Sequence, residues 1–427
     1  RGLVVTPMPV TLTPAEIVGR VEWLGCRAVL LGRSQVRTLS GLLPSPLHVL
    51  DESTVAENEE LTLPAAVDVS GDADALYEFT SGTTGRPRVV RITHRNIQAN
   101  TESILNFLNL ARDDRMLVVL PFSYVFGASL LHTHLRAGAA MILQPNFVFP
   151  ESIVERMISE RCTGFAGVPS TFHLLLRNSS FRSRRVATLR SIQQAGGKLP
   201  PVLIRELVEA QPQAQLFVMY GQTEATARLS YLSPEEVLSR IGSVGRGIPG
   251  VELSVIGRNG EPVAPGTVGE IRARGQNISP GYLNDPVATA AKMGGGELRT
   301  GDLATVDQDG YIYVVDRAED FIKSWGHRIA GQDVEAVVMQ LPDVVAAAVV
   351  GVPDEAAGGR VEVGLVQRRG AILDTETVLA HCRAQLAKHM VPVTVHLVEQ
   401  LPLNANGKVS KRDVRAYCVR MAGEQSA

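Results

Sequence analysis

The chain has 427 residues, of which 45% are hydrophobic and 20% charged, the composition of an ordinary globular protein with room for two or more cores. Its net charge of −2 is too small for the protein's overall electrostatic field to attract it to nucleic acid or to an acidic membrane. Its longest uncharged apolar run, Val344 to Val352, is about half the length that a membrane helix needs, and no signal peptide is visible.

The cysteines and the chain start add two expectations. Four widely separated cysteines form no CxxC pair, disulfide pattern or zinc pattern, which indicates a reducing cytoplasm; they are Cys26, Cys162, Cys382 and Cys418. The chain opens at Arg1 within "RGLVVTPMPVTLT", a run that reads as mid-chain, so we expect that some N-terminal sequence is missing.

Between Leu76 and Gly221, apolar strand-like runs alternate with helix-like stretches. This alternation predicts parallel sheets covered by helices on both faces. The predicted strands are 116–122, 139–145, 163–169, 190–196 and 216–221, and the predicted helices begin at Asn96, Val125, Pro150, Ser170 and Pro200.

The texture changes after Gly242, where "VELSVIGRNGEPV", "GEIRARG" and "DQDGYIYVVDR" combine short strands with Asn-Gly and Asp-Gly turns. Such turns predict antiparallel hairpins. After Arg317 a third texture predicts a small α+β unit of about a hundred residues. Its expected elements are a helix at 331–340, strands at 344–352 and 361–367, a helix at 374–386 and a strand at 393–399.

The stretch "YEFTSGTTGRPRVVRITHRN", from Tyr77 to Asn96, places a turn rich in small residues between two apolar runs. Glycines permit positive φ, so that successive backbone N–H groups can face an anion, while hydroxyls and two arginines add donors and charge. The turn therefore suits a polyphosphate, although a solvent-exposed flexible loop has the same composition. The turn is neither a Walker loop nor a dinucleotide fingerprint.

The order of these residues closely resembles the signature loop of the adenylate-forming superfamily, which contains acyl-CoA synthetases, peptide-synthetase adenylation domains and luciferases. Further motifs of that superfamily follow in its order and rough spacing: "YGQTEA" (220–225), "RTGDLATVDQDGYIYVVDRAEDFIKSWGHRI" (299–329), "GVPDEAAGG" (351–359) and "LPLNANGKVSKRDV" (401–414). The loop departs from the family pattern where Arg88 and Val89 replace the usual lysine and glycine.

The resemblance implies an α/β fold in which a large domain, residues 1–317, holds two helix-flanked sheets and a small β-barrel-like part. A small, mobile α+β domain, residues 318–427, follows it. It also implies an enzyme that uses ATP and Mg²⁺ to activate a carboxylic acid as its acyl adenylate. The acyl group then passes to the thiol of CoA or of a carrier protein's phosphopantetheine.

The resemblance also implies residue roles for the nucleotide site. Glu224 would hold magnesium and Thr223 would reach the α-phosphate. Asp302 and Arg317 would bind the ribose, although an ion pair that fixes a hairpin would explain them as well. The β- and γ-phosphates would lie against Thr80, Ser81, Gly82, Thr83, Thr84, Gly85 and Arg88, and the adenine against Ala195, Gly196, Gly197, Tyr220 and Gly221.

Lys408, in "NANGKV", would supply the cation between the carboxylate and the α-phosphate. Because this lysine must approach for adenylation and withdraw for thioester formation, the small domain is expected to rotate between two poses about Glu319. Gly326, in the loop 324–329, would then line the thiol tunnel.

The segment "LPFSYVFGASLLHTHLRAG" (120–138) lies where relatives place the acyl pocket. It contains no acidic residue to pair with an ammonium group, which favours an uncharged acyl or aryl acid over an amino acid. Tyr124 is either a gate between carboxylate and thiol or a core residue, and Ser129, Val168 and Gly196 are expected to line the pocket. His132 and His134 face different sides of a helix, so they are read as ordinary helix residues.

The sequence does not decide which thiol accepts the acyl group. The basic stretch 177–190 could meet the phosphates of CoA or an acidic carrier protein, or it could be a solvated loop. Three functions remain: a ligase ending in a thioester, including an amino acid adenylation domain of a peptide-synthetase pathway; a ligase that stops at or oxidises the adenylate; and a catalytically weakened nucleotide-binding homologue.

Overall fold

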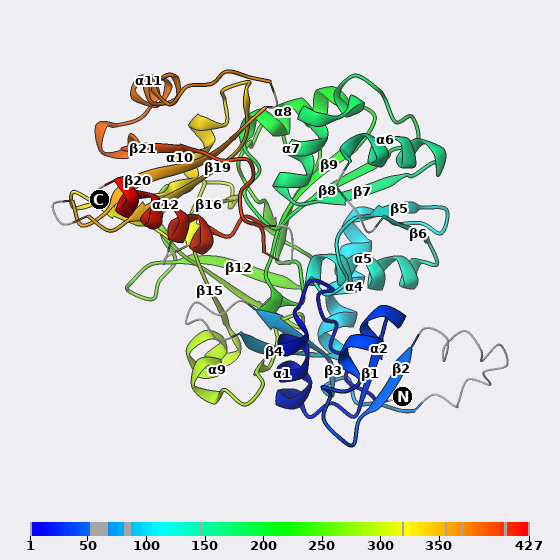
Figure 1. Ribbon diagram of the computed structural model, residues 1–427. Coiled ribbons are helices and arrows are strands. Elements are labelled where there is room, and N and C mark those ends of the chain that lie inside the picture. The colour runs from blue at the N-terminus through cyan, green and yellow to red at the C-terminus, as the bar shows by residue number, and fades with distance from the viewer. Residues whose placement is uncertain are drawn as a thin grey trace.

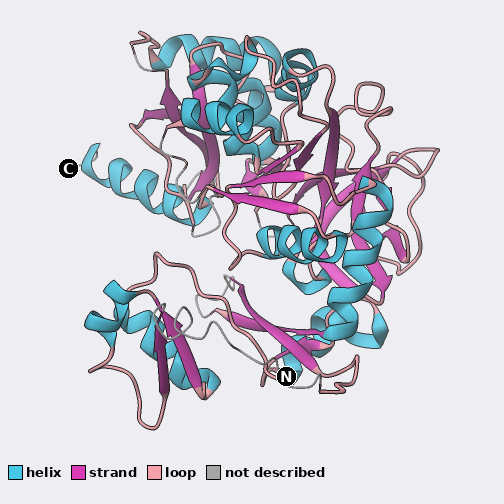
Figure 2. Cartoon of the chain, turned by 90° about the vertical axis from the view of Figure 1, so that its right-hand side faces the viewer, coloured by secondary structure: helices cyan, strands magenta, loops and turns pink. Residues whose placement is uncertain are grey.

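The computed structural model describes residues 2–51, 67–80, 87–144, 147, 149–317, 320–354, 357–368, 370–404 and 408–425. The chain forms several sheets with helices packed against them, and its two ends lie on opposite sides of the molecule (Figures 1 and 2). Within the described ranges no helix has the length and apolar character to cross a membrane.

The central sheet has seven strands in the order β11-β10-β9-β8-β7-β5-β6. The five strands from β6 to β9 are parallel, as the sequence predicts, and β10 and β11 extend the sheet antiparallel. Their bounds are β5 Arg115–Val118, β6 Ala140–Leu143, β7 Gly164–Gly167, β8 Ser191–Gln194, β9 Gln215–Tyr220, β10 Ser230–Leu232 and β11 Arg246–Gly247.

Helices cover both faces of this sheet because successive strand residues point to opposite sides. Leu117 and Ile192 pack into one hydrophobic cluster with α6, α7 and α8, whereas Met116 and Phe217 pack into another with α4 and α5. The helices are α4 His94–Leu108, α5 Val125–Ala137, α6 Pro150–Ser159, α7 Pro169–Asn178 and α8 Pro201–Ala210.

The two strands on either side of the turn that suits a polyphosphate belong to a separate, antiparallel sheet. β3 (Asp74–Thr80) and β4 (Arg88–Thr93) pair with each other as a hairpin, and β14 (Gly281–Tyr282) pairs with β4. This part of the chain therefore departs from the parallel arrangement expected from Leu76 onward. The N-terminal segment adds α1 Pro14–Leu24, β1 Ala28–Leu31, α2 Arg33–Leu39 and β2 His48–Asp51.

The hairpins expected after Gly242 form a four-stranded antiparallel sheet, β12-β13-β15-β16. This sheet occupies the place of the expected barrel-like part, and its last strand leads to the C-terminal unit. The bounds are β12 Val251–Ile256, β13 Gly269–Gly275, α9 Pro286–Met293, β15 Leu298–Val306 and β16 Ile312–Arg317.

The C-terminal unit is a three-stranded sheet, β19-β20-β21, with helices against it and a small hairpin before it. Every element predicted there is present, and one more, α12, was missed by the sequence reading; it carries the C-terminus in Figure 2. The bounds are β17 Ile322–Ser324, β18 His327–Ile329, α10 Gly331–Val338, β19 Val344–Val352, β20 Arg360–Gln367, α11 Thr375–Gln385, β21 Thr394–Leu397 and α12 Lys411–Gln425.

Candidate active site

A cleft of about 1670 Å³ lies between the carboxyl ends of the central parallel strands and the C-terminal unit. Carboxyl ends of parallel strands are where open α/β sheets place their ligands. Residues from both sides line it, including Val168, Gly196 and Tyr220 from the large part and Lys408 from the small one. Residues that are far apart in the sequence therefore meet in one space.

The residues assigned to the ribose and the adenine form one connected cluster. The Tyr220 hydroxyl donates a hydrogen bond of 2.5 Å to Oδ2 of Asp302, and Nε of Arg317 lies 3.3 Å from Oδ1 of the same carboxylate. Burial, followed by the charge of Asp302, raises the pKa of Tyr220 well above its ordinary value. The phenol therefore stays a hydrogen-bond donor to Asp302, which lines the cleft.

The position directly after β9 must be a glycine, here Gly221, because another part of the backbone passes very close to it. A Cβ at this position would lie 1.8 Å from the carbonyl oxygen of Ala227. The strand therefore ends in a tight turn, and the turn leads into the short helix η2 (Thr223–Ala225). Thr223, assigned to the α-phosphate, begins this helix and is half-buried.

Glu224, assigned to the metal, is buried, and its Oε1 accepts a 2.7 Å hydrogen bond from the Tyr282 hydroxyl. No described residue donates to Oε2. A carboxylate is the hard oxygen ligand that Mg²⁺ prefers, and an oriented carboxylate with a free oxygen fits that role. Tyr282, from β14, is therefore a positioning residue that the sequence reading did not single out.

The structure describes the two ends of the turn that suits a polyphosphate but not its middle. Thr80 ends β3 opposite Arg88, while Ser81, Gly82, Thr83, Thr84 and Gly85 lie outside the described residues. The Arg88 guanidinium contacts the Tyr282 ring at 5.4 Å and lies 3.5 Å from the Asp285 carboxylate. Val89, which replaces the family glycine, has its side chain buried in the core.

Lys408, Gly196 and Tyr124 converge at the end of β8. A Cβ on Gly196 would lie 2.7 Å from the Tyr124 hydroxyl, 2.9 Å from Val168 and 3.1 Å from Cε of Lys408, and its φ is +87°. Nζ of Lys408 lies 5.2 Å from the centre of the Tyr124 ring. Glycine at position 196 therefore leaves room for the side chains of Tyr124 and Lys408. Of its neighbours, Ala195 is buried and Gly197 packs near Pro169.

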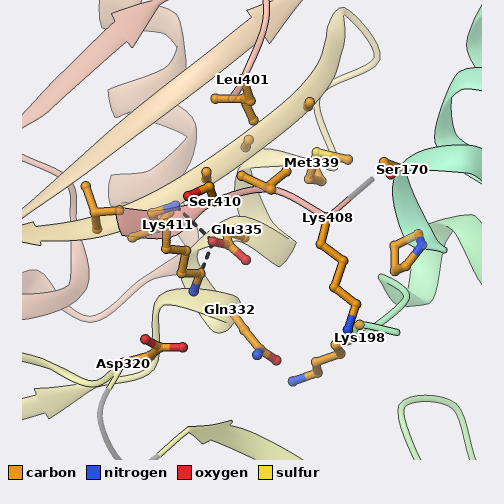
Figure 3. A pocket seen from close by; sticks show the side chains of 18 of the residues that line it. Ser170, Lys198, Asp320, Gln332, Glu335, Met339, Leu401, Lys408, Ser410 and Lys411 are labelled. Atoms are coloured by element: carbon orange, nitrogen blue, oxygen red, sulfur yellow. Dashed lines mark hydrogen bonds and ion pairs between the residues drawn. The ribbon is translucent and has the colours of Figure 1, made fainter. Parts of the chain in front are cut away.

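Lys408 reaches this point from the C-terminal unit, and its side chain extends toward the large part beside that of Lys198 (Figure 3). Lys198 is already paired with Asp333, at 3.6 Å. In the part of the chain that the structure describes, no carboxylate pairs with Lys408. Its charge is thus available to an anion in the cleft.

Of the other residues expected at the acyl pocket, Val168 lines the cleft at the start of α7. Ser129 is buried, and its hydroxyl donates to the carbonyl of Phe126 within α5, at 2.7 Å. Nδ1 of His134 lies 2.8 Å from the Leu130 carbonyl. No group of three potential metal ligands forms around either His132 or His134 among the described residues.

Gly326 and Glu319 are the residues expected to serve the movement of the C-terminal unit. Glu319, the expected hinge, lies outside the described residues. Gly326 lies in the exposed turn between β17 and β18, with φ of +78° and no atom within 4 Å of a Cβ built on it. It is not among the described residues that line the cleft in this conformation.

Three arginines of the basic stretch 177–190 have carboxylate partners. Arg177 pairs with Glu206, Arg184 with Glu151 and Arg190 with Asp114. Much of the positive charge of this stretch is therefore paired with carboxylates of the same chain.

The structure brings to the cleft, or next to it, further polar residues that the sequence reading missed. His173 lines it with Nε2 buried and without a partner among the described residues, and burial lowers the pKa of its ring to about 4. Arg228, four residues after Glu224, does not itself line the cleft, but it is buried beside Met219, which does. Its place directly after the "YGQTEA" motif was the one sequence signal that could have drawn attention to it.

Comparison with known proteins agrees with this geometry. The chain matches the AMP-binding enzyme family over residues 1–283 and the AMP-binding enzyme C-terminal domain over residues 333–408. It is 35% identical over 377 residues to a feruloyl-CoA synthase of an Amycolatopsis species, covering 88% of this chain and 74% of the relative. It is 32% identical over 409 residues to the 2-succinylbenzoate–CoA ligase of Geobacillus kaustophilus, covering 95% of this chain and 81% of that relative.

Among solved structures, O-succinylbenzoate coenzyme A synthetase of Bacillus subtilis in complex with ATP and magnesium superimposes with a TM-score of 0.82. The two are 27% identical, and the match covers 96% of this chain and 83% of the other. A family match over more than half of the chain, together with relatives above 30% identity, decides the membership. The chain belongs to the AMP-binding enzyme family, within the adenylate-forming superfamily, and is a ligase that joins a carboxylic acid to a thiol.

Proposed function

We propose that this enzyme activates a carboxylic acid other than an α-amino acid with ATP, and that CoA is its acceptor. The observation that supports this most directly is the placement of Lys408, which reaches Gly196 and Tyr124 at the end of β8. The nucleotide cluster of Tyr220 and Asp302 lines the same cleft, and Glu224 follows shortly after the end of β9. A cation at this point can neutralise a carboxylate as it attacks the α-phosphate.

In the proposed reaction, the substrate carboxylate oxygen bonds to the α-phosphorus of ATP and pyrophosphate leaves. Asp302 and Arg317 hold the ribose, Tyr220 covers the adenine, and Glu224 would hold Mg²⁺. That ion would offset the charge of the phosphates. Lys408 stabilises the charge between carboxylate and phosphate, and Thr223 donates to the α-phosphate. A thiol then displaces AMP from the acyl adenylate.

The second step needs Lys408 to leave the space that it occupies here. We propose that the C-terminal unit, from residue 318 onward, rotates about Glu319 and brings Gly326 to the cleft. Gly326 lies in an exposed turn, and a Cβ built on it would meet no atom within 4 Å, so the surroundings of this glycine are open. The four cysteines are free thiols, which supports a reducing, cytoplasmic setting.

We predict that the acid is not an α-amino acid. Recognition of an ammonium group needs a carboxylate close by, and at an effective dielectric constant of about 20 such a pair is worth about 4 kcal/mol at 4 Å. The side chains that meet at Gly196 are those of Tyr124, Val168 and Lys408, and none is acidic. The measurement is ATP–pyrophosphate exchange with amino acids in competition with deamino analogues of the same side chain.

The expected result is exchange with deamino acids alone. A clear preference for any α-amino acid would contradict the pocket assignment and indicate an adenylation domain of the peptide-synthetase type. The acceptor is tested by adding either CoA or a phosphopantetheine-loaded carrier protein to the preformed adenylate. Faster AMP release with the carrier than with CoA would replace CoA as the proposed acceptor.

A further inference from the structure

Arg228 is the largest fully buried side chain among the described residues, with 1% of its surface exposed. Its backbone is fixed, because its carbonyl oxygen accepts hydrogen bonds from the side-chain amides of Asn100 and Asn277 at 3.0 and 2.9 Å. Its position directly after the turn at Gly221 and the helix η2 places it within the active-site segment. The fixed backbone therefore limits where the guanidinium can lie.

The guanidinium has no charged partner among the described residues. Its Nε donates to the thioether sulfur of Met219 at 3.3 Å, and its Cζ lies 4.0 Å from the centre of the Phe126 ring. Its Nη2 is buried and has no hydrogen-bond partner in the described part of the chain. Burial lowers the pKa of Arg228 to about 10, so the group still carries its charge at neutral pH. Buried charges without a partner are rare because desolvation is costly.

The contacts of Arg228 place it against the segment assigned to the acyl pocket. Phe126 lies in the first turn of α5, and its ring lies 6.2 Å from the ring of Tyr124, which in turn contacts Lys408. Met219, which covers the guanidinium, also lines the cleft. Methionine is a flexible side chain that adapts readily to a new neighbour. Two aromatic rings thus separate the cation of Lys408 from that of Arg228.

We propose that Arg228 binds a second carboxylate of the substrate, so that the enzyme activates a dicarboxylic acid. This rests on the proposed function: one carboxylate is activated beside Lys408, and the other pairs with Nη2 of Arg228, which becomes accessible from the cleft when the Met219 side chain moves aside. A guanidinium presents a planar fork of donors that matches a carboxylate. The proposal replaces the sequence-based expectation of an uncharged acyl group. It also adds a repulsive charge against an ammonium group.

The experiment compares matched pairs of acids in ATP–pyrophosphate exchange. Each pair is a dicarboxylic acid and its monocarboxamide, which has the same shape but one charge fewer; succinate, adipate and terephthalate supply a range of lengths. For at least one pair we expect kcat/KM to be ten- to a hundredfold higher for the diacid. Arg228→Gln is expected to abolish that preference while exchange with the monocarboxamide persists, and Arg228→Lys to keep part of it.

Arg272→Gln is the matched control, because Arg272 is also largely buried but pairs with Glu297 at 3.0 Å in the sheet of β13. It should leave the diacid preference intact. Equal kcat/KM for diacid and monocarboxamide in every pair with the wild-type enzyme would overturn the proposal, even if Arg228→Gln fails to fold. A diacid preference that survives in Arg228→Gln would overturn it too. Exchange with monocarboxylic acids in either case would leave the proposed function standing, whereas no exchange with any acid would refute both.

Discussion

Replacing Lys408 by alanine is expected to lower the rate of adenylate formation by about 10²- to 10³-fold, the loss typical when one donor that stabilises developing charge is removed. Lys408 is the side chain that the C-terminal unit sends to Gly196 and Tyr124. Only the first half-reaction develops charge between carboxylate and phosphate at that point. The measurement is ATP–pyrophosphate exchange with the best acid, beside AMP release from chemically prepared acyl adenylate and CoA.

Transfer from preformed adenylate to CoA should fall by less than about threefold in Lys408→Ala, because the rotated pose removes Lys408 from the site. Lys198→Ala is the matched control. Lys198 reaches the same part of the cleft as Lys408 (Figure 3), but it is paired with Asp333. Adenylation should fall much less in that variant. Equal loss of both half-reactions in Lys408→Ala would mean that the lysine holds the structure rather than serving the first step.

Replacing Glu224 by glutamine is expected to lower adenylation by about 10²-fold at limiting Mg²⁺. The substitution removes the negative charge of the ligand but keeps its shape and its ability to accept from Tyr282. Because the phosphates of ATP also bind the ion, excess Mg²⁺ should restore part of the rate. The measurement is the Mg²⁺ dependence of pyrophosphate exchange, together with a thermal melt to show that the variant is folded.

Tyr282→Phe is the companion variant for this prediction. It leaves the Glu224 carboxylate in place and removes the 2.7 Å hydrogen bond that orients it. The effect on Mg²⁺ dependence should be about tenfold, in the range typical of outer-shell partners. An unchanged Mg²⁺ dependence in Glu224→Gln would remove Glu224 from the metal site.

Much of the fold follows from the sequence because its physical causes are local. The five parallel strands β5 to β9 are short apolar runs between amphipathic helices, and that alternation leaves few arrangements. The antiparallel pairing of β3 with β4 could also have been anticipated, because the connection from Thr80 to Arg88 is too short for the crossover that parallel strands need. α12 was missed because it is mostly polar and buries few side chains, among them Val414 and Cys418.

The candidate site, too, could be predicted only where its residues stand in sequence motifs. Lys408 and Asp302 stand in motifs whose order carries their expected roles, so their meeting in one cleft could be anticipated. Arg228 could not, because the fate of a single arginine after a motif depends on tertiary packing: here the strand β9 and the helix α5 close around it. Tyr282 likewise gains its partner, Glu224, only through long-range pairing.

The central claim, that this chain forms an acyl adenylate and passes the acyl group to a thiol, is tested most directly by one measurement. Purified protein is assayed for ATP–pyrophosphate exchange across a panel of mono- and dicarboxylic acids, and CoA is then added to the acid that supports exchange. We expect the ligase reaction to show as exchange that depends on the acid, followed by AMP release and formation of an acyl-CoA thioester. Absence of exchange with every acid, while ATP still binds, would contradict it and indicate a nucleotide-binding protein without ligase activity.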